Sequence, residues 1–269
     1  MEFVDHIGHK IQLDKYPKRI VSLVPSQTEL LVDLGLSDRL VGITKFCVHP
    51  SSLRREKTIV GGTKAVKHDV IEALNPDLII ANKEENERAD IERLTAKYPT
   101  WTSDIKSLDD ACQMIQDIGV LTNTTQAAEA LNSEIKSGFE AIPHGSTKVA
   151  LYLIWKNPYM AAGPDTFIHQ MLPFAGFQNV IHDPEARYPE LSETEIERLH
   201  PTYILLSSEP FPFKGKHTAE VQARFPKSTI MEVDGEMFSW YGSRLKRATT
   251  YFTNLLRLAE NKRERSKDA

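Results

Sequence analysis

One stretch of sequence occurs twice in the chain, and this repeat constrains the fold more than any other feature. Residues 71–84, IEALNPDLIIANKE, align without gaps with residues 196–209, IERLHPTYILLSSE. Each copy predicts a short helix that ends before a proline and is followed by a buried strand, because the residue before proline disfavours helix and the next residues are apolar. The phrase is common in α/β proteins, so a chance match stands as the alternative to duplication.

The segments upstream of the two copies also follow the same order. The apolar run 19–25 precedes a helical pattern that ends at Gly35, and the apolar run Lys148–Trp155 precedes a helical pattern over residues 167–176. Residues 40–44 add a further strand. Strands that alternate with helices are typical of a parallel sheet, so we predict an α/β fold with two related lobes.

The segment between the predicted lobes favours helix. Residues 108–142 contain almost no proline, few glycines and apolar residues at helical spacing, so we expect a helical bridge rather than a flexible linker. Loop-forming residues follow at 142–147. This predicts an N-terminal lobe over 1–107, a bridge over 108–142 and a C-terminal lobe over 143–269, which closes with a helix over 243–259 and a solvated tail from 261.

Composition excludes several classes of protein. The 33 basic and 37 acidic residues give a net charge of −4, without the basic excess that nucleic-acid binding needs. Apolar runs fall far short of the ~20 residues that span a bilayer. The two cysteines provide neither a disulfide framework nor a four-ligand zinc site. Residues 1–10 lack the pattern of a secretory signal, so we expect a cytoplasmic protein or one from which a leader was removed.

Polar and aromatic residues follow the predicted strands. Ligands of open parallel sheets bind outside the carboxyl ends of the strands, so these residues are the candidate ligand contacts. Aromatic walls combined with carboxylates, a thiol and cations across a cleft suit a bulky amphipathic or metal-containing ligand. The predicted contacts are Cys47, His49, Lys64, Glu84, Glu85, Trp155, Tyr159, Glu209, Phe211, Phe213, Trp240 and Arg244.

Several of these residues have a structural interpretation that stays open. Cys47 and His49 have a spacing that can chelate a metal, but only two ligands are in view, so metal binding by protein side chains is unknown. Residues 61–64, GGTK, favour a tight turn over a phosphate loop. Glu84 and Glu85 also suit the first turn of a helix, the tryptophans also suit a core, and residues 192–195, SETE, form a helix-capping pattern.

Three motifs resemble one family of transport proteins. Residues 17–31, PKRIVSLVPSQTELL, together with NPDLII at 75–80 and AGPDTF at 162–167, resemble the ABC-transporter substrate-binding proteins that include the cobalamin and ferric-siderophore receptors. The resemblance implies two Rossmann-like lobes with parallel sheets, joined by a single long helix, with the ligand in the cleft between them. It also implies a periplasmic location and docking on the membrane subunits through Asp69 and through Glu193 or Glu195.

The resemblance and the residues together predict binding rather than catalysis. We expect a monomer without an intrinsic cofactor that captures a corrinoid, a ferric siderophore or a haem-like chelate for an ABC importer, and that neither spans a membrane nor binds nucleic acid. One alternative is a cytoplasmic carrier or sensor of a metal or corrinoid on the same scaffold. Another is a hydrolase or transferase with Cys47 as nucleophile, although no nucleophile elbow or dinucleotide fingerprint supports an enzyme.

Overall fold

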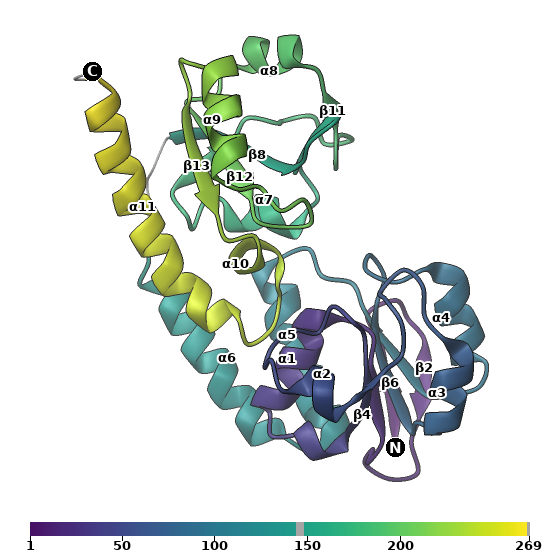
Figure 1. Cartoon of the computed structure of the whole chain (residues 1–269). Helices are drawn as coiled ribbons and strands as arrows, with labels where there is room; N and C mark the ends of the chain where they lie inside the picture. Colours follow the sequence, from purple (N-terminus) through teal and green to yellow (C-terminus); the bar gives the residue numbers. More distant parts are fainter. Residues whose placement is uncertain (144–147, 268–269) are drawn as a thin grey trace. The chain divides into compact units, whose positions relative to one another are not determined.

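The computed structural model describes residues 1–143 and 148–267. The chain divides into two compact units, and neither unit is one continuous stretch of sequence (Figure 1). Unit 1 comprises Met1–Ile105, Asp109–Glu134 and Trp240–Arg244. Unit 2 comprises Lys106–Leu108, Ile135–Ser239 and Leu245–Ala269.

Unit 1 is built on a five-stranded sheet in which all strands are parallel. Along the sheet the order is β5-β4-β3-β6-β7. Every residue of β3, β6 and β7 is buried, as expected for parallel strands that are covered on both faces. The strands are β3 (Ile20–Ser22), β4 (Leu40–Ile43), β5 (Thr58–Ile59), β6 (Leu78–Asn82) and β7 (Thr100–Ser103), preceded by a separate antiparallel hairpin of β1 (Glu2–Val4) and β2 (Lys10–Gln12).

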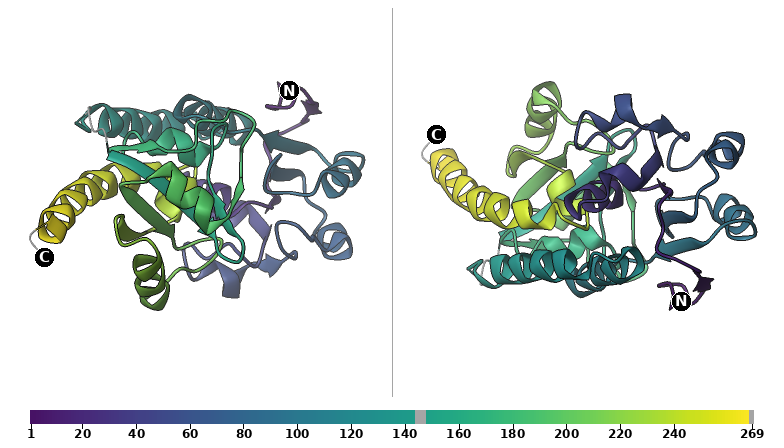
Figure 2. Two further views of the ribbon diagram at one scale, coloured as in Figure 1. Left: turned by 90° about the horizontal axis from the view of Figure 1, so that it is seen from above. Right: turned by 90° about the horizontal axis from the view of Figure 1, so that it is seen from below.

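Helices cover both faces of this sheet. In Figures 1 and 2, α3 and α4 lie on one side, and α1 and α5 lie on the other. Ile71 of α3 and Ile91 of α4 pack with Val21 and Ile79 of the sheet in one apolar cluster. The helical elements are α1 (Pro25–Asp33), the 3-10 helix η1 (Ser37–Arg39), α2 (Leu53–Glu56), α3 (His68–Leu74), α4 (Arg88–Thr95) and α5 (Leu108–Thr122).

Unit 2 contains a mixed sheet, in which a parallel core is extended by antiparallel strands. Strands β10, β8, β12 and β13 are parallel, whereas β9 pairs with β8 and β11 pairs with β9 in antiparallel fashion. The antiparallel pairs arise where the chain turns back after β8 at residues 156–158. The strands are β8 (Lys148–Trp155), β9 (Tyr159–Ala161), β10 (Phe177–Asn179), β11 (Glu190–Leu191), β12 (Tyr203–Ser207) and β13 (Thr229–Val233).

The two faces of the unit 2 sheet carry different helices because side chains of a strand alternate between faces. Ile204 and Leu206 of β12 pack in one cluster with Ile196 of α8 and Val221 of α9. On the other face, the Tyr203 hydroxyl donates to the carbonyl oxygen of Ala259 in α11, at 3.2 Å. The helices are α7 (Phe167–Met171), α8 (Glu193–Leu199), α9 (Gly215–Arg224), α10 (Glu236–Ser239) and α11 (Leu245–Lys267).

The repeated phrase of the sequence adopts the same local structure in both units. Helices α3 and α8 end at Asn75 and His200, which occupy the same position in the repeat and have left-handed backbones with φ of 45° and 47°. A proline follows each, and strands β6 and β12 begin at corresponding residues, Leu78 and Tyr203. The predicted succession of helix, proline and strand is therefore correct in both copies.

The bridging segment is helical, as predicted, but it forms two helices rather than one. Helix α5 ends at Thr122 and α6 (Thr125–Glu140) begins after Asn123, whose backbone is left-handed with φ of 59°. Only residues such as Asn and Gly adopt this conformation readily, and it ends α5. Helix α6 contributes residues to both units. The predicted lobe boundaries stay a prediction, and residues 144–147 of the expected loop lie outside the described residues.

The C-terminal helix is longer than the sequence pattern indicates. Helix α11 runs from Leu245 to Lys267, so the predicted solvated tail from residue 261 is helical over most of its length. The apolar spacing that marks a helix stops near Ala259, but a polar sequence continues a helix once it is nucleated. None of the helices in the described part of the chain is long and apolar enough to cross a membrane.

Candidate ligand-binding site

The end of β6 holds a turn that presents two predicted contact residues. The Asn82 side-chain oxygen accepts hydrogen bonds from the amides of Glu84 and Glu85, at 2.8 and 3.0 Å. Asn86 accepts from the amide of Asn82 at 2.9 Å and is itself buried. These bonds fix the turn at the carboxyl edge of the sheet, where Glu84 is exposed and Glu85 is half-buried.

Lys64 lies in a tight turn next to this acidic turn. Its Nζ donates to the carbonyl oxygen of Glu84 at 2.8 Å and lies 3.4 Å from the Glu87 carboxylate. Gly61 has φ of 111° and pairs with Val66 in an isolated bridge, so residues 61–64 form a turn, as the sequence favours. The position requires glycine because an added Cβ would lie 2.4 Å from a backbone oxygen.

Cys47 anchors the loop that follows β4. Its side chain is fully buried, and the sulfur lies 3.1 Å from the Thr28 hydroxyl and 3.3 Å from the Thr44 hydroxyl. Burial raises the pKa of the thiol, the opposite of what an activated nucleophile needs. Ligand contact by this sulfur would require the loop to open. Across the described residues, no group of three or more His, Cys, Asp and Glu side chains could hold a metal ion.

His49, Trp240 and Arg244 come together in unit 1 around a buried carboxylate. Arg244 donates to Glu29 from Nε at 2.8 Å and from Nη2 at 2.7 Å. The guanidinium carbon lies 4.8 Å from the centroid of the Trp240 ring, and this ring meets His49 edge-on, with 5.4 Å between centroids. The structure thus unites three predicted contact residues that are far apart in the sequence.

Glu29 is the partner that we did not include among the predicted contacts. It lies in the middle of α1 and only 6% of its side chain is exposed. A signal exists in the sequence, because Glu29 directly precedes the two buried leucines Leu30 and Leu31 and a buried carboxylate needs a cationic partner. The sequence does not tell which of the many basic residues is that partner.

The predicted aromatic residues of unit 2 are exposed Trp155, half-buried Phe211 and Tyr159, and buried Phe213. Trp155 is 40% exposed, and its ring meets Phe211 edge-on with 5.6 Å between centroids. Phe211 also contacts Phe213, at 4.8 Å, but Phe213 is only 5% exposed and belongs to the core. Tyr159 packs against the same core, where burial raises the pKa of its hydroxyl. Trp155 and Phe211 therefore offer the aromatic surface of this edge.

Glu209 follows β12 at the carboxyl edge of the unit 2 sheet. Its Oε1 accepts a hydrogen bond from the Ser239 hydroxyl at 2.6 Å. Its backbone oxygen accepts from the Ser207 hydroxyl at 2.6 Å. Gly235 packs against this turn so closely that an added Cβ would lie 2.4 Å from the Ser207 oxygen. The half-buried carboxylate is therefore held in a defined position.

The three predicted docking acids differ in their local partners. Asp69 is exposed in the first turn of α3. Glu193 begins α8 and forms an ion pair with Arg224. Glu195 completes the predicted capping box, since its carboxylate accepts from the Ser192 amide and hydroxyl at 2.7 and 2.6 Å, and these bonds lower its pKa. The Glu195 carboxylate thus caps the N-terminus of α8.

This arrangement defines a class of protein: two α/β units whose sheet edges carry aromatic and charged side chains suited to binding a small molecule. A family model described as "Periplasmic binding protein" matches residues 20–230. The chain belongs to this family of substrate-binding proteins.

Similar proteins with curated names cover much of the chain. A vitamin B12-binding protein of Pectobacterium carotovorum is 24% identical over 237 residues, covering 85% of this chain and 84% of that protein. A cobalamin-binding protein of Halobacterium salinarum is 28% identical over 204 residues, covering 72% of this chain and 55% of that protein. An ABC transporter substrate-binding lipoprotein of Bacillus subtilis is 26% identical over 213 residues, covering 75% of this chain and 67% of that protein.

Solved structures share the fold. The periplasmic vitamin B12-binding protein of Vibrio cholerae has a TM-score of 0.77 at 20% identity, over 91% of this chain and 98% of that chain. A periplasmic haem-binding protein of Roseiflexus has a TM-score of 0.75 at 21% identity, over 89% of this chain and 97% of that chain. At these identities the likeness concerns the fold, and the ligand has to be argued from the residues of this chain.

Proposed function

We propose that this protein captures a corrinoid or haem-like metal chelate and delivers it to an ABC importer outside the cytoplasm. The observation that carries the proposal is the edge-on pair of exposed Trp155 and half-buried Phe211 at the carboxyl edge of the unit 2 sheet, with 5.6 Å between ring centroids. Such rings suit the flat apolar body of a macrocyclic chelate. Relatives named as vitamin B12-binding and cobalamin-binding proteins support the same ligand class.

Each unit offers proposed contacts at the carboxyl edge of its own sheet. In unit 1, Arg244 holds Trp240 beside His49 through its ion pair with Glu29. Among the residues that the structure describes, no group of three or more His, Cys, Asp and Glu side chains could hold a metal ion. We propose that the metal arrives as part of the ligand. A ferric siderophore also brings its own metal ion, so it is tested together with the macrocycles.

A panel of thermal melts tests the ligand class. Cyanocobalamin, haem and several ferric siderophores are added at saturating concentration, and a ligand at ~100 times its dissociation constant stabilises the folded state by about 2.7 kcal/mol. At roughly 2–4 °C per kcal/mol for a chain of this size, such binding gives a clear shift. No shift with any of these ligands would overturn the proposal.

Substitutions of exposed residues then locate the binding surface. Trp155→Ala should weaken binding and reduce the thermal shift, because it removes the exposed half of the aromatic pair. Leu258→Ala is the matched control, since Leu258 is 59% exposed on α11 and is not a predicted contact. Equal effects of the two substitutions would argue against the proposed surface.

Docking on a transporter is a separate part of the proposal. We infer that Asp69 and Glu193 pair with basic groups of the membrane subunits, because both carboxylates lie at the surface ends of helices in the repeated element. Asp69→Lys and Glu193→Lys should reduce ATPase stimulation of the reconstituted transporter while ligand affinity stays unchanged. Glu72→Lys on the exposed side of α3 serves as the control.

A further inference from the structure

Lys45 and Phe46 stand at the carboxyl edge of the unit 1 sheet, two and three residues after the end of β4. The Lys45 Nζ lies 5.0 Å from the centroid of the Phe46 ring. Both side chains are exposed, and 49% of Phe46 is accessible. An ammonium group near an aromatic face at an exposed site adds little stability by itself, so the pair has no evident structural role.

The backbone of this pair is held in place from both sides. Thr44 and Cys47 are fully buried, and their side chains contact each other at 3.3 Å. The Lys45 amide donates to the carbonyl oxygen of Gly61 at 2.8 Å. A Cβ on Gly62 would lie 3.2 Å from the Phe46 ring and 3.4 Å from the Lys45 side chain. The Phe46 ring and the Lys45 stem therefore pack closely over Gly62, where a larger residue would press against them.

Lys45 differs from other cations at the same edge in its ion pairing. Lys83 pairs with Asp104 at 2.6 Å, Lys64 lies 3.4 Å from Glu87, and Arg244 pairs with Glu29. Lys45 has no carboxylate partner in the described part of the chain. Its ammonium group is thus available to an anionic group that arrives from outside.

We propose that Lys45 and Phe46 select ligands that combine a flat apolar body with carboxylates at its rim. Phe46 packs against the body of the macrocycle and Lys45 pairs with a peripheral carboxylate, an interaction that strengthens when the ligand excludes water. The inference rests on the proposed function and narrows its ligand class. It favours haem, which carries two propionates, over cobalamin, whose side chains are mainly amides.

Paired ligands that differ only in their carboxylates test this inference. Haem, haem dimethyl ester and cyanocobalamin are titrated against the wild-type protein and against Lys45→Met, which removes the charge and keeps the length of the side chain. Binding is followed by tryptophan fluorescence and by the absorbance of the ligand. Wild-type protein should bind haem more tightly than its ester, and Lys45→Met should weaken haem binding by about tenfold without affecting the ester.

Two further variants separate the charge from general effects of substitution. Lys83→Met removes a charge at the same edge that Asp104 already neutralises, and it should leave both affinities unchanged. Phe46→Leu should weaken haem and its ester alike, because it removes aromatic surface only. Melting temperatures of the ligand-free variants verify that each remains folded.

The outcomes distinguish this inference from the proposed function. If wild-type protein binds haem and its ester equally, or if Lys45→Met weakens both to the same extent, the inference that Lys45 selects ligands with carboxylates is wrong. The proposal that the protein binds a macrocycle is then still supported. Binding of cobalamin alone would lead to the same conclusion. If no macrocycle and no ferric siderophore binds the wild-type protein, the proposed function itself is wrong.

Discussion

Arg244 and Glu29 form a bidentate ion pair inside unit 1, although 215 residues separate them in the sequence. Only 4% and 6% of the two side chains are exposed. Each carboxylate oxygen accepts one of the two hydrogen bonds, and this bidentate geometry helps to compensate for desolvating two charges. The pair explains why Trp240–Arg244, a short segment between two elements of unit 2, belongs to unit 1.

Removing one partner of this pair should destabilise unit 1 strongly. Arg244→Met leaves the Glu29 carboxylate buried without its cation, and we expect a loss of about 3–5 kcal/mol in the free energy of unfolding. Urea denaturation followed by circular dichroism measures this loss. The double variant Glu29→Leu, Arg244→Met should recover part of it, because no unpaired charge then remains buried.

An exposed ion pair provides the control for this experiment. Arg88 and Glu92 pair at 2.7 Å on α4, with 91% and 58% of their side chains exposed. Arg88→Ala should leave the urea midpoint unchanged, since exposed pairs gain little over hydration. If Arg244→Met and Arg88→Ala behaved alike, Arg244 would be a surface residue in solution and the buried pair would be disproved.

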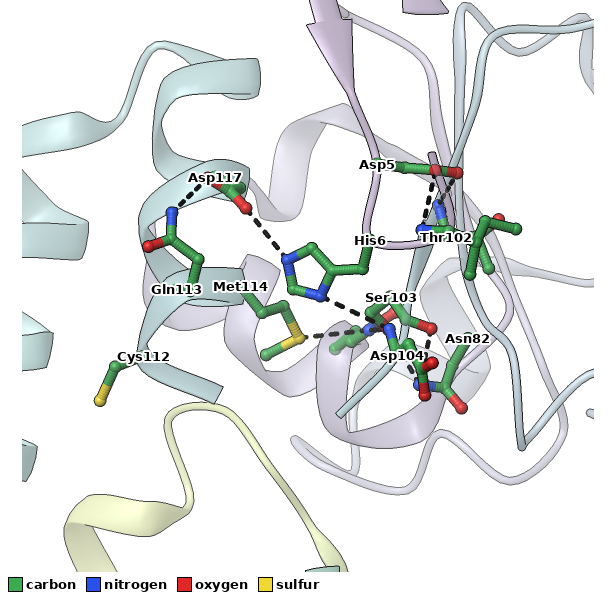
Figure 3. Close-up of polar contacts among 12 residues, drawn as sticks. Asp5, His6, Asn82, Thr102, Ser103, Asp104, Cys112, Gln113, Met114 and Asp117 are labelled. Carbon is green, nitrogen blue, oxygen red and sulfur yellow. Dashed lines mark hydrogen bonds and ion pairs between the residues drawn. The ribbon is translucent and has the colours of Figure 1, made fainter. Parts of the chain in front are cut away.

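His6 ties the N-terminal hairpin to α5 in a contact that depends on pH. Its Nε2 lies 3.0 Å from the Asp117 carboxylate (Figure 3). Its ring meets Trp101 edge-on, with 4.9 Å between ring centroids. Burial by itself lowers the pKa of His6, but the hydrogen bond and the charge of Asp117 outweigh it and the net pKa is raised. Asp5 shapes the same loop, since it accepts from the His9 amide at 2.7 Å.

The raised pKa fixes the sign of the pH effect. The ion pair stabilises the folded state fully below the unfolded pKa of His6, near 6.5, and this contribution is lost as pH rises through the folded pKa. Asp117→Asn should therefore cost about 1 kcal/mol at pH 5.5 and less at pH 8.5. Urea midpoints over this range measure the difference, with His182→Gln as control because His182 is exposed. A cost for Asp117→Asn that does not vary with pH would contradict the assignment.

The fold is largely predictable because it rests on local patterns. Asn75 and His200 precede prolines and buried strands, so the helix end and the following strand can be located in both copies without a structure. The break at Asn123 is harder to predict, since the apolar spacing continues on both sides of it. The antiparallel strands of unit 2 are also missed, because strands of two or three residues leave no clear period in a sequence.

The candidate site is predictable only in part. Rules for parallel sheets locate the segments that follow the strands, and therefore lead to His49, Trp240 and Arg244. They do not reveal that Glu29 lies between these segments, because a contact over 215 residues depends on the tertiary fold. Nor do they separate exposed Trp155 from buried Phe213, since both rings lie at or beyond the carboxyl end of a strand and the sequence does not show which of them packs into the core.

Cys47 should react slowly in the folded protein. Its thiol is fully buried and its pKa is raised by burial, so little thiolate forms at neutral pH. A maleimide reagent should label it at a rate close to that of unfolding, and both Cys47 and Cys112 rapidly in urea, since both are buried in the folded state. Mass spectrometry of tryptic peptides assigns the label. Rapid labelling of Cys47 in the native protein would instead support the alternative of a nucleophilic thiol.

Gly163→Ala should destabilise unit 2, although the substitution adds only one methyl group. A Cβ at residue 163 would lie 1.8 Å from the backbone oxygen of Ala186, and the Gly163 amide donates to the Arg187 oxygen at 2.8 Å. Because a backbone atom cannot move aside as a side chain does, this hydrogen bond must be distorted. We expect a loss of about 3 kcal/mol in the free energy of unfolding.

Gly215→Ala tests whether the loss at residue 163 comes from close packing rather than from replacing glycine. Gly215 begins α9, and the nearest atom to an added Cβ is 4.0 Å away. Alanine favours helix over glycine, so this variant should be unchanged or more stable by up to about 1 kcal/mol. Urea denaturation of the two variants side by side measures both effects. Equal midpoints would mean that the chain around Ala186 does not approach Gly163 as the structure describes, because the two positions differ chiefly in that backbone oxygen.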